Sequence, residues 1–162
     1  MVKLCSETLI AAPLERCFDL ARSVDVHTVG ASPIHGKAIA GRMAGLSTQG
    51  DWTTWSARFF SLRFSLTTAI TDFNPLCGFS DALRGGLFTE FGHVYHFAAK
   101  GVGQTMMTDE FSFQSPFGFL GAFFDSVLLR PRMQATMDFR AVTIKRIAES
   151  DEWLTYLSMA SH

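Results

Sequence analysis

The chain has 162 residues, and its 16 Phe, 3 Trp and 2 Tyr contrast with a charged fraction of only 18%, against about 25% in typical soluble domains. A hydrophobic fraction of 48% and a formal net charge of −1 exclude intrinsic disorder and leave no basic field for nucleic acid. We therefore expect one folded domain whose many rings fill a core, line a cavity or meet a partner.

The beginning of the chain predicts a strand followed by two short helices. A loosely alternating segment at 3–11 ends before Pro13, which is tolerated in the first turn of the helix expected over 12–22. A second short helix or turn follows at 23–29, and Gly, Ser and Pro residues mark a loop at 30–36.

Alternation of apolar and polar residues then predicts consecutive antiparallel strands. The turns are marked by Gly50-Asp51, Asn74-Pro75 and the segment 100–103. The strands are expected at 37–45, 52–60, 62–73, 76–83, 87–99 and 104–113.

From Phe119 the apolar pattern becomes helical and continues to Glu149, with a kink expected at Pro131. The order of elements predicts an α+β fold, in which a curved antiparallel sheet of about six or seven strands wraps around a long C-terminal helix. We assign residues 1–149 to one domain and 150–162 to a C-terminal extension with a short helix. This extension packs on the body, closes a cavity or meets a second copy.

The strongest site signal comes from the hairpin at 87–113. Its apolar face carries three ionisable side chains, those of His93, Tyr95 and Asp109. A loop at 100–102 would place Asp109 opposite His93, whereas a loop at 101–103 with a left-handed Gly103 would place it opposite Tyr95. Either register keeps Asp109 within direct or diagonal reach of both.

A carboxylate among phenylalanine rings must be paired or neutral, so these three residues predict a polar cluster. Three roles remain open: a structural network, an anchor for a ligand carbonyl or hydroxyl, and an acid–base pair of His93 and Asp109. The expected walls of a ligand cavity are Phe60, Phe64, Phe91, Phe97, Met107, Phe111 and Met137.

Other ionisable residues suggest no separate site. We interpret His27 and His35 as surface histidines of the 28–36 loop, because no cysteine or second carboxylate joins them at metal-ligand spacing. Arg140 lies near the apolar stripe of the long helix. We interpret it primarily as a structural residue, which could also reach Asp81 or a ligand carboxylate. The sequence predicts no metal and no cofactor.

The compartment is suggested by cysteine use and by the N-terminus. Cys5, Cys17 and Cys77 are odd in number and lack CxxC spacing, which is typical of reduced thiols in a cytosolic protein. The first seven residues do not form a signal peptide, and no apolar run reaches the roughly 18 residues of a membrane helix. We expect a cytoplasmic protein without membrane insertion.

Several short motifs recur along the chain in a familiar order: Ala12-Pro13-Leu14, Ala38-Ile39-Ala40-Gly41, Gly50-Asp51-Trp52, Phe79-Ser80-Asp81, His93 and Ser115-Pro116-Phe117-Gly118. Together they resemble the START/Bet v 1-like superfamily, also called SRPBCC, and more narrowly its bacterial polyketide cyclase/dehydrase-like branch. The chain departs from the branch where it has Phe59-Phe60-Ser61 instead of His-Phe-Gly and Tyr95 instead of a second histidine.

The resemblance covers about residues 3–149 and implies a helix-grip fold. It also implies binding of a small hydrophobic or amphipathic molecule (a lipid, isoprenoid or polyketide) between the sheet and the long helix. The alternatives are a cyclase or dehydratase using His93 and Asp109, and an interaction or regulatory module without a ligand. We expect a monomer or homodimer.

Overall fold

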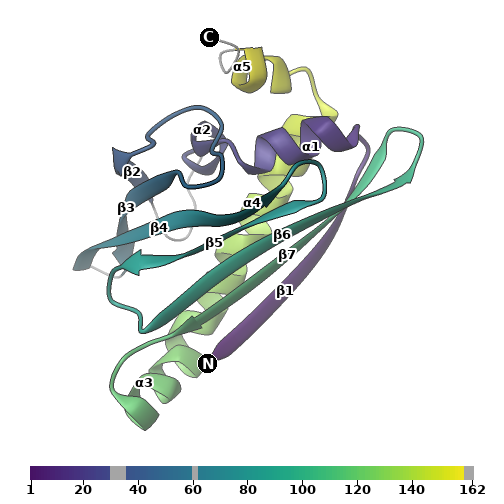
Figure 1. Cartoon of the computed structure of the whole chain (residues 1–162). Coiled ribbons are helices and arrows are strands. Elements are labelled where there is room, and N and C mark those ends of the chain that lie inside the picture. Colours follow the sequence, from purple (N-terminus) through teal and green to yellow (C-terminus); the bar gives the residue numbers. More distant parts are fainter. Residues whose placement is uncertain (30–35, 60–61, 159–162) are drawn as a thin grey trace.

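The structure is a computed structural model that describes residues 1–29, 36–59 and 62–158. Seven antiparallel strands form one curved sheet in the order β1-β7-β6-β5-β4-β3-β2 (Figure 1). The strands are β1 (Val2–Ile10), β2 (Lys37–Gly41), β3 (Trp52–Phe59), β4 (Leu62–Asn74), β5 (Gly78–Gly85), β6 (Glu90–Gly101) and β7 (Gln104–Gln114). The predicted α+β class and its sheet are confirmed.

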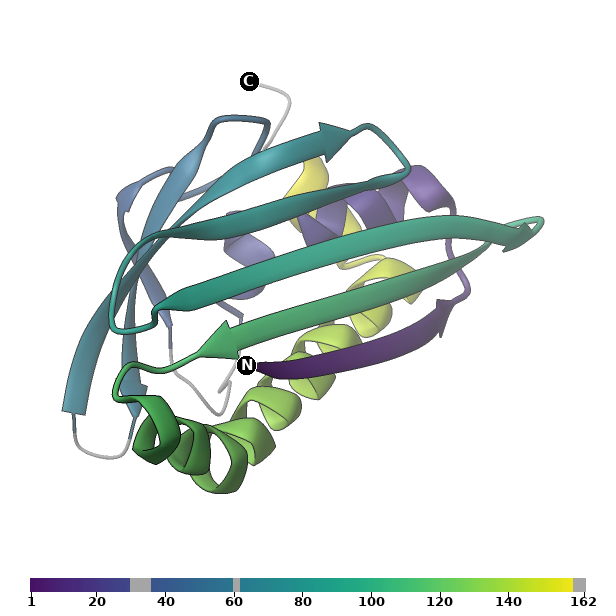
Figure 2. The same ribbon diagram turned by 60° about the horizontal axis from the view of Figure 1, so that its bottom comes forward.

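The helices gather on one face of this sheet, as the two views show (Figures 1 and 2). They are α1 (Leu14–Ala21), α2 (Val24–His27), α3 (Gly118–Phe124), α4 (Arg130–Glu149) and α5 (Trp153–Leu157). A π-helical segment at Asp125–Leu129 joins α3 to α4. These three helical segments follow one another without a break, so the predicted long C-terminal helix is confirmed, and Pro131 lies directly after the π-helical segment, in the first turn of α4.

The β6–β7 hairpin has the register that requires a left-handed glycine. Gly103 has φ +67°, and Tyr95 pairs with Asp109 while His93 pairs with Phe111. His93, Tyr95 and Asp109 are all buried on the face toward α4, as the alternation predicted. Only the register had been left open by the sequence.

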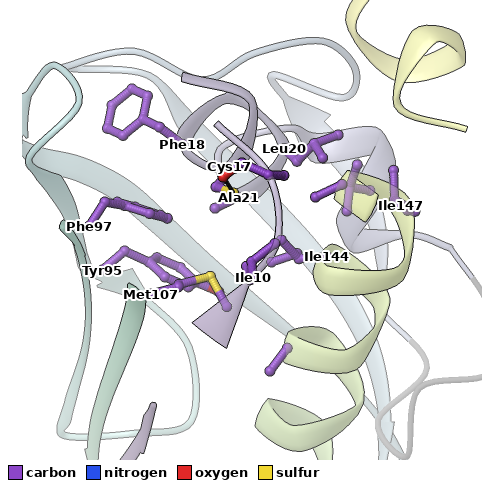
Figure 3. Packing of buried hydrophobic residues seen from close by; sticks show 14 of the residues in the cluster. Ile10, Cys17, Phe18, Leu20, Ala21, Tyr95, Phe97, Met107, Ile144 and Ile147 are labelled. Carbon is purple, nitrogen blue, oxygen red and sulfur yellow. Dashed lines mark hydrogen bonds between the residues drawn. The ribbon is translucent and has the colours of Figure 1, made fainter. Parts of the chain in front are cut away.

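A solid aromatic core fills the end of the sheet beneath α1 (Figure 3). The Phe18 ring lies 5.5 Å from the rings of Phe73 and Phe97, centroid to centroid. Ile144 and Ile147 close this core from α4 and are fully buried. A second cluster consists of Leu4, Phe111, Phe113, Leu129, Met133 and Met137.

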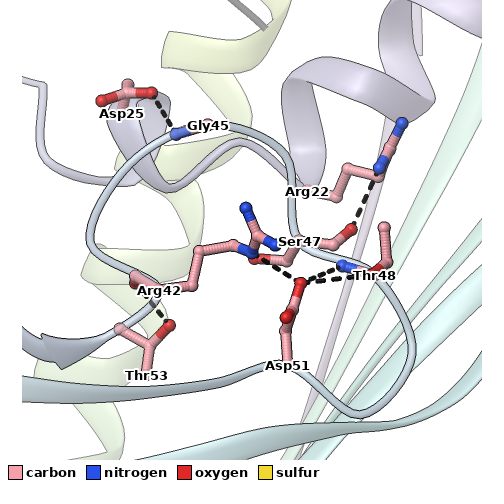
Figure 4. Close-up of polar contacts among 8 residues, drawn as sticks. All are labelled: Arg22, Asp25, Arg42, Gly45, Ser47, Thr48, Asp51 and Thr53. Atoms are coloured by element: carbon pink, nitrogen blue, oxygen red, sulfur yellow. Dashed lines mark hydrogen bonds and ion pairs between the residues drawn. The ribbon is translucent and has the colours of Figure 1, made fainter. Parts of the chain in front are cut away.

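Polar contacts hold the β2–β3 connection against α1 and α2 (Figure 4). Asp25 accepts a hydrogen bond from the Gly45 N–H at 2.7 Å, and Arg22 donates one to the Ser47 carbonyl at 3.1 Å. Asp51 binds Arg42 and the Thr48 N–H within the connection. These bonds fix the position of α2 and therefore that of His27 at its end.

The C-terminal helix α5 packs back onto the body. The Arg16 guanidinium lies 4.3 Å from the centre of the Trp153 ring, and Tyr156 and Leu157 contact the core beneath α1. Among residues 1–29, 36–59 and 62–158, no helix is long and apolar enough to cross a membrane.

Candidate functional site

A cavity of about 150 Å³ lies between the sheet and α4. Five of the predicted site residues line it, namely Phe64, Phe91, His93, Phe111 and Met137. Further walls come from β3, β4, the β5–β6 connection and α4, with Trp55, Ala57, Leu66, Phe88, Met133, Thr136 and Phe139. The cavity is therefore mostly aromatic and aliphatic.

The other predicted site residues are placed elsewhere. Tyr95, Phe97 and Met107 lie instead in the solid core beneath α1, because Phe18 and Ile144 fill the space above them. Asp109 lies behind His93 and is 1% exposed. Phe60 lies outside the residues that the structure describes.

His93 is positioned between two carboxylates. Its Nε2 lies 2.5 Å from Asp109 Oδ1, a diagonal contact across the β6–β7 pair, and its Nδ1 lies 3.9 Å from Asp81 Oδ2. Asp81 is directly opposite His93 on β5. The imidazole is thus hydrogen-bonded to Asp109 on one side and lies near Asp81 on the other, and its ring lines the cavity.

Asp81 is a cavity residue that we did not predict as a site residue from the sequence. Burial raises the pKa of its carboxyl group, although His93 and Arg140 act in the opposite direction. Its Oδ1 atom is buried without a hydrogen-bond partner among the described residues. Asp81 shares a strand face with Phe79, whose partner is Tyr95, so the alternation of β5 was the signal that could have identified it.

Arg140 brings a cation from α4 to the cavity wall. Burial alone lowers its pKa, but Tyr95, Asp109 and Asp81 together raise it above its ordinary value. The guanidinium forms no ion pair with a carboxylate of the described residues. Among the described residues the Tyr95 hydroxyl interacts with the guanidinium, and the remaining N–H donors can bind a group inside the cavity.

His35 falls outside the described residues. His27 lies in the same cavity wall as Arg140 and is not the surface residue that we expected. Its Nε2 lies 2.7 Å from the Ala21 carbonyl, so this nitrogen carries the proton. Burial and the nearby Arg140 cation hold the pKa of His27 well below its ordinary value. Nδ1 is then an acceptor, and it is buried without a partner among the described residues.

The low pKa of His27 predicts a loss of stability in mild acid. The unfolded chain takes up a proton on this histidine below its ordinary pKa of 6.5, whereas the folded state does not. The free energy of unfolding should therefore fall as the pH decreases from 6.5 toward the folded pKa, by up to about 1.4 kcal/mol per pH unit.

His27→Gln keeps a donor for the Ala21 carbonyl but cannot titrate. Urea denaturation at about pH 7 and about pH 5 should show a decrease that is smaller in the variant by about 1–2 kcal/mol. An equal decrease in both proteins would show that the folded state tolerates a charged His27. Subtracting the two proteins also removes the contribution of Asp81, whose raised pKa acts with the opposite sign.

The polar end of the cavity combines three features. Arg140 offers charged donors, Asp81 has a carboxyl group whose pKa is raised by burial, and His27 presents Nδ1 as an acceptor. The remaining walls are hydrophobic and mostly aromatic. Such a site matches an apolar molecule with one negatively charged or strongly polarised oxygen.

No protein-family model and no curated protein sequence matches the chain. Its structure is similar to that of TTHA0849 from Thermus thermophilus, with a TM-score of 0.71 and 14% identity over 90% of this chain and 95% of that one. A START superfamily protein from Mycobacterium smegmatis gives a TM-score of 0.67 and 11% identity over 91% and 97% of the two chains.

The Zhui aromatase/cyclase from Streptomyces sp. R1128 gives a TM-score of 0.68 and 10% identity, covering 93% of this chain and 97% of that one. Identities this low establish a common fold and nothing about activity. The chain thus shares the helix-grip fold of these structures, which is the fold that the resemblance of its sequence motifs led us to expect.

Proposed function

We propose that this protein binds a small aromatic or isoprenoid-like molecule whose single anionic or enolic oxygen contacts Arg140. The observation that carries the proposal is an aromatic-walled cavity of about 150 Å³ with a guanidinium in its wall that lacks an ion-pair partner among the described residues. The apolar part of the ligand would lie against Phe64, Phe91 and Phe111.

The charges around the cavity support an anionic group. Burial and Arg140 hold the pKa of His27 well below its ordinary value, and burial raises the pKa of the Asp81 carboxyl group. Asp109 is already engaged by His93 at 2.5 Å. This leaves Arg140 as the cation to be compensated, and a ligand oxygen would do so in a site of low dielectric constant. The structural similarity to a START superfamily protein and to an aromatase/cyclase agrees with a ligand-binding role.

The acid–base alternative has less support from the geometry. Nε2 of His93 is hydrogen-bonded to Asp109 at 2.5 Å and is not left for a substrate, whereas Nδ1 lies 3.9 Å from Asp81, beyond hydrogen-bond distance. A general base must reach the proton that it removes. We propose that His93 and Asp109 support the wall that holds Asp81.

Filling the cavity should abolish binding without unfolding the protein. Thr136 lies in the cavity wall, whereas its neighbour Ala135 is exposed on the other side of α4. Thr136→Phe should weaken binding of the fluorescent probe 2-naphthoate by at least about tenfold, because the new ring occupies the ligand's space.

Ala135→Phe is the matched control and should bind the probe like the wild type. Fluorescence titration measures both affinities, and thermal unfolding checks that both variants fold. Failure of the wild type to bind 2-naphthoate, or equal binding by Thr136→Phe, would contradict the proposed site.

A further inference from the structure

A second feature of the molecule lies outside the cavity, at the end of the sheet where β7 leads into α3 (Figure 1). Here a group of large apolar side chains faces outward. We call it the α3 surface and define it as Phe117, Phe119, Leu120, Phe123, Val127 and Leu128. Phe117 and Phe119 are each 82% exposed and Phe123 is 68% exposed, which is unusual for rings in a folded domain.

The helix that carries this surface is anchored through one narrow side. A Cβ atom at Gly121 would lie 2.0 Å from the Pro116 carbonyl oxygen, so α3 approaches the strand end as closely as a glycine permits. Asp125 accepts a hydrogen bond from the Ser115 N–H at 2.8 Å, and Leu129 is buried in the second cluster. The outward rings are therefore held in place and do not belong to a fraying end.

The backbone conformation at the start of α3 also indicates that this surface has a function. Phe117 has φ +75°, a left-handed conformation that is unfavourable for a bulky side chain. Its ring gains no burial in return. A strained residue that exposes an aromatic ring, followed by a π-helical segment, is typical of a functional surface.

The chemistry of the α3 surface favours a lipid bilayer over a protein. Between residues 117 and 129 the only charged side chain is Asp125, which is buried, and the only exposed polar side chain is Ser126. A protein partner would find few groups for the hydrogen bonds that protein interfaces normally contain. A hydrocarbon phase requires none, because a helix satisfies its own backbone.

The charges that flank this surface are positive. Arg130 follows it directly and is exposed, and Arg132 comes two residues later. No exposed carboxylate occurs between residues 111 and 137. We propose that the α3 surface inserts its rings into the headgroup boundary of an anionic membrane while Arg130 binds lipid phosphate. The protein then lies on the bilayer, since none of its described helices is fit to span one.

Co-sedimentation with vesicles tests this proposal on the full chain. We expect the wild type to bind vesicles of phosphatidylcholine containing about 30% phosphatidylglycerol, and to bind pure phosphatidylcholine several-fold more weakly. Phe119→Ser combined with Phe123→Ser should reduce binding to both by at least about tenfold, because two inserted rings are lost. Arg130→Gln should weaken binding to the anionic vesicles only.

Val102→Ser is the matched control, because Val102 is fully exposed at the opposite end of the β6–β7 hairpin. It should bind vesicles like the wild type. Vesicle binding that is absent from the wild type, or unchanged in the double variant, would overturn the proposal. So would a wild-type dimer, seen by sedimentation velocity and lost in the double variant, because the α3 surface would then belong to a second copy.

The membrane proposal stands separately from the cavity ligand. Titration of the same variants with 2-naphthoate in solution reports on the cavity and on correct folding. The double variant should retain the wild-type affinity for this probe, so a failure at the membrane is distinguished from a failure in the cavity.

Discussion

Replacing Asp109 with leucine should lower the free energy of unfolding by about 3 kcal/mol, the scale expected when one member of a buried charged pair is removed. Asp109 is 1% exposed and accepts a hydrogen bond from His93 Nε2 at 2.5 Å. The change leaves that nitrogen buried without a partner and removes one of the negative charges that raise the pKa of Arg140. Urea denaturation followed by circular dichroism measures the effect.

Two further variants make this result specific. Glu110→Leu changes the next residue of β7, which faces solvent, and should alter stability by no more than about 0.5 kcal/mol. His93→Phe combined with Asp109→Leu removes both partners and should be more stable than Asp109→Leu alone. Equal losses in the single and double variants would show that the pairing of the two residues contributes little.

The second large effect should come from the guanidinium in the cavity wall. Arg140→Met keeps much of the side-chain length but removes the charge and all donors, so the affinity for 2-naphthoate should fall by about 10- to 100-fold. The affinity for 2-methylnaphthalene, which has the same rings and no carboxylate, should remain close to that of the wild type. Isothermal titration or fluorescence competition gives both values.

Arg146→Met is the control for this experiment, since Arg146 lies on the same helix and its ion pair with Glu152 is exposed. It should bind both probes normally. A loss of affinity for both probes in Arg140→Met would contradict an anion-binding role and would make Arg140 a structural residue of the wall.

The hairpin of β6 and β7 shows how far sequence reasoning reaches. Strand alternation depends only on local geometry, so it placed His93, Tyr95 and Asp109 on the buried face. The register depended on the loop, where a left-handed Gly103 selects the pairing of Tyr95 with Asp109. Diagonal contact across that register then brings His93 to Asp109.

The cavity shows where such reasoning stops. Phe91 and Phe97 lie on the same face of β6, yet Phe91 lines the cavity and Phe97 packs against Phe18. The difference depends on what lies above each ring, and α1 and α4 reach that position from distant parts of the chain. Asp81, Arg140 and His27 likewise come from three separate elements.

The sequence by itself determined the order of elements, the buried face of the β6–β7 hairpin and the presence of rings around a polar cluster, because these follow from periodicity and turn chemistry. Only the tertiary structure decided which rings touch one another and which leave a cavity of about 150 Å³. It also showed that the rings of α3 face outward, because close packing at Gly121 and the hydrogen bond that the Ser115 N–H donates to Asp125 fix the side of the helix that meets the body. Those contacts depend on the three-dimensional arrangement of the elements, so the local sequence pattern does not predict them.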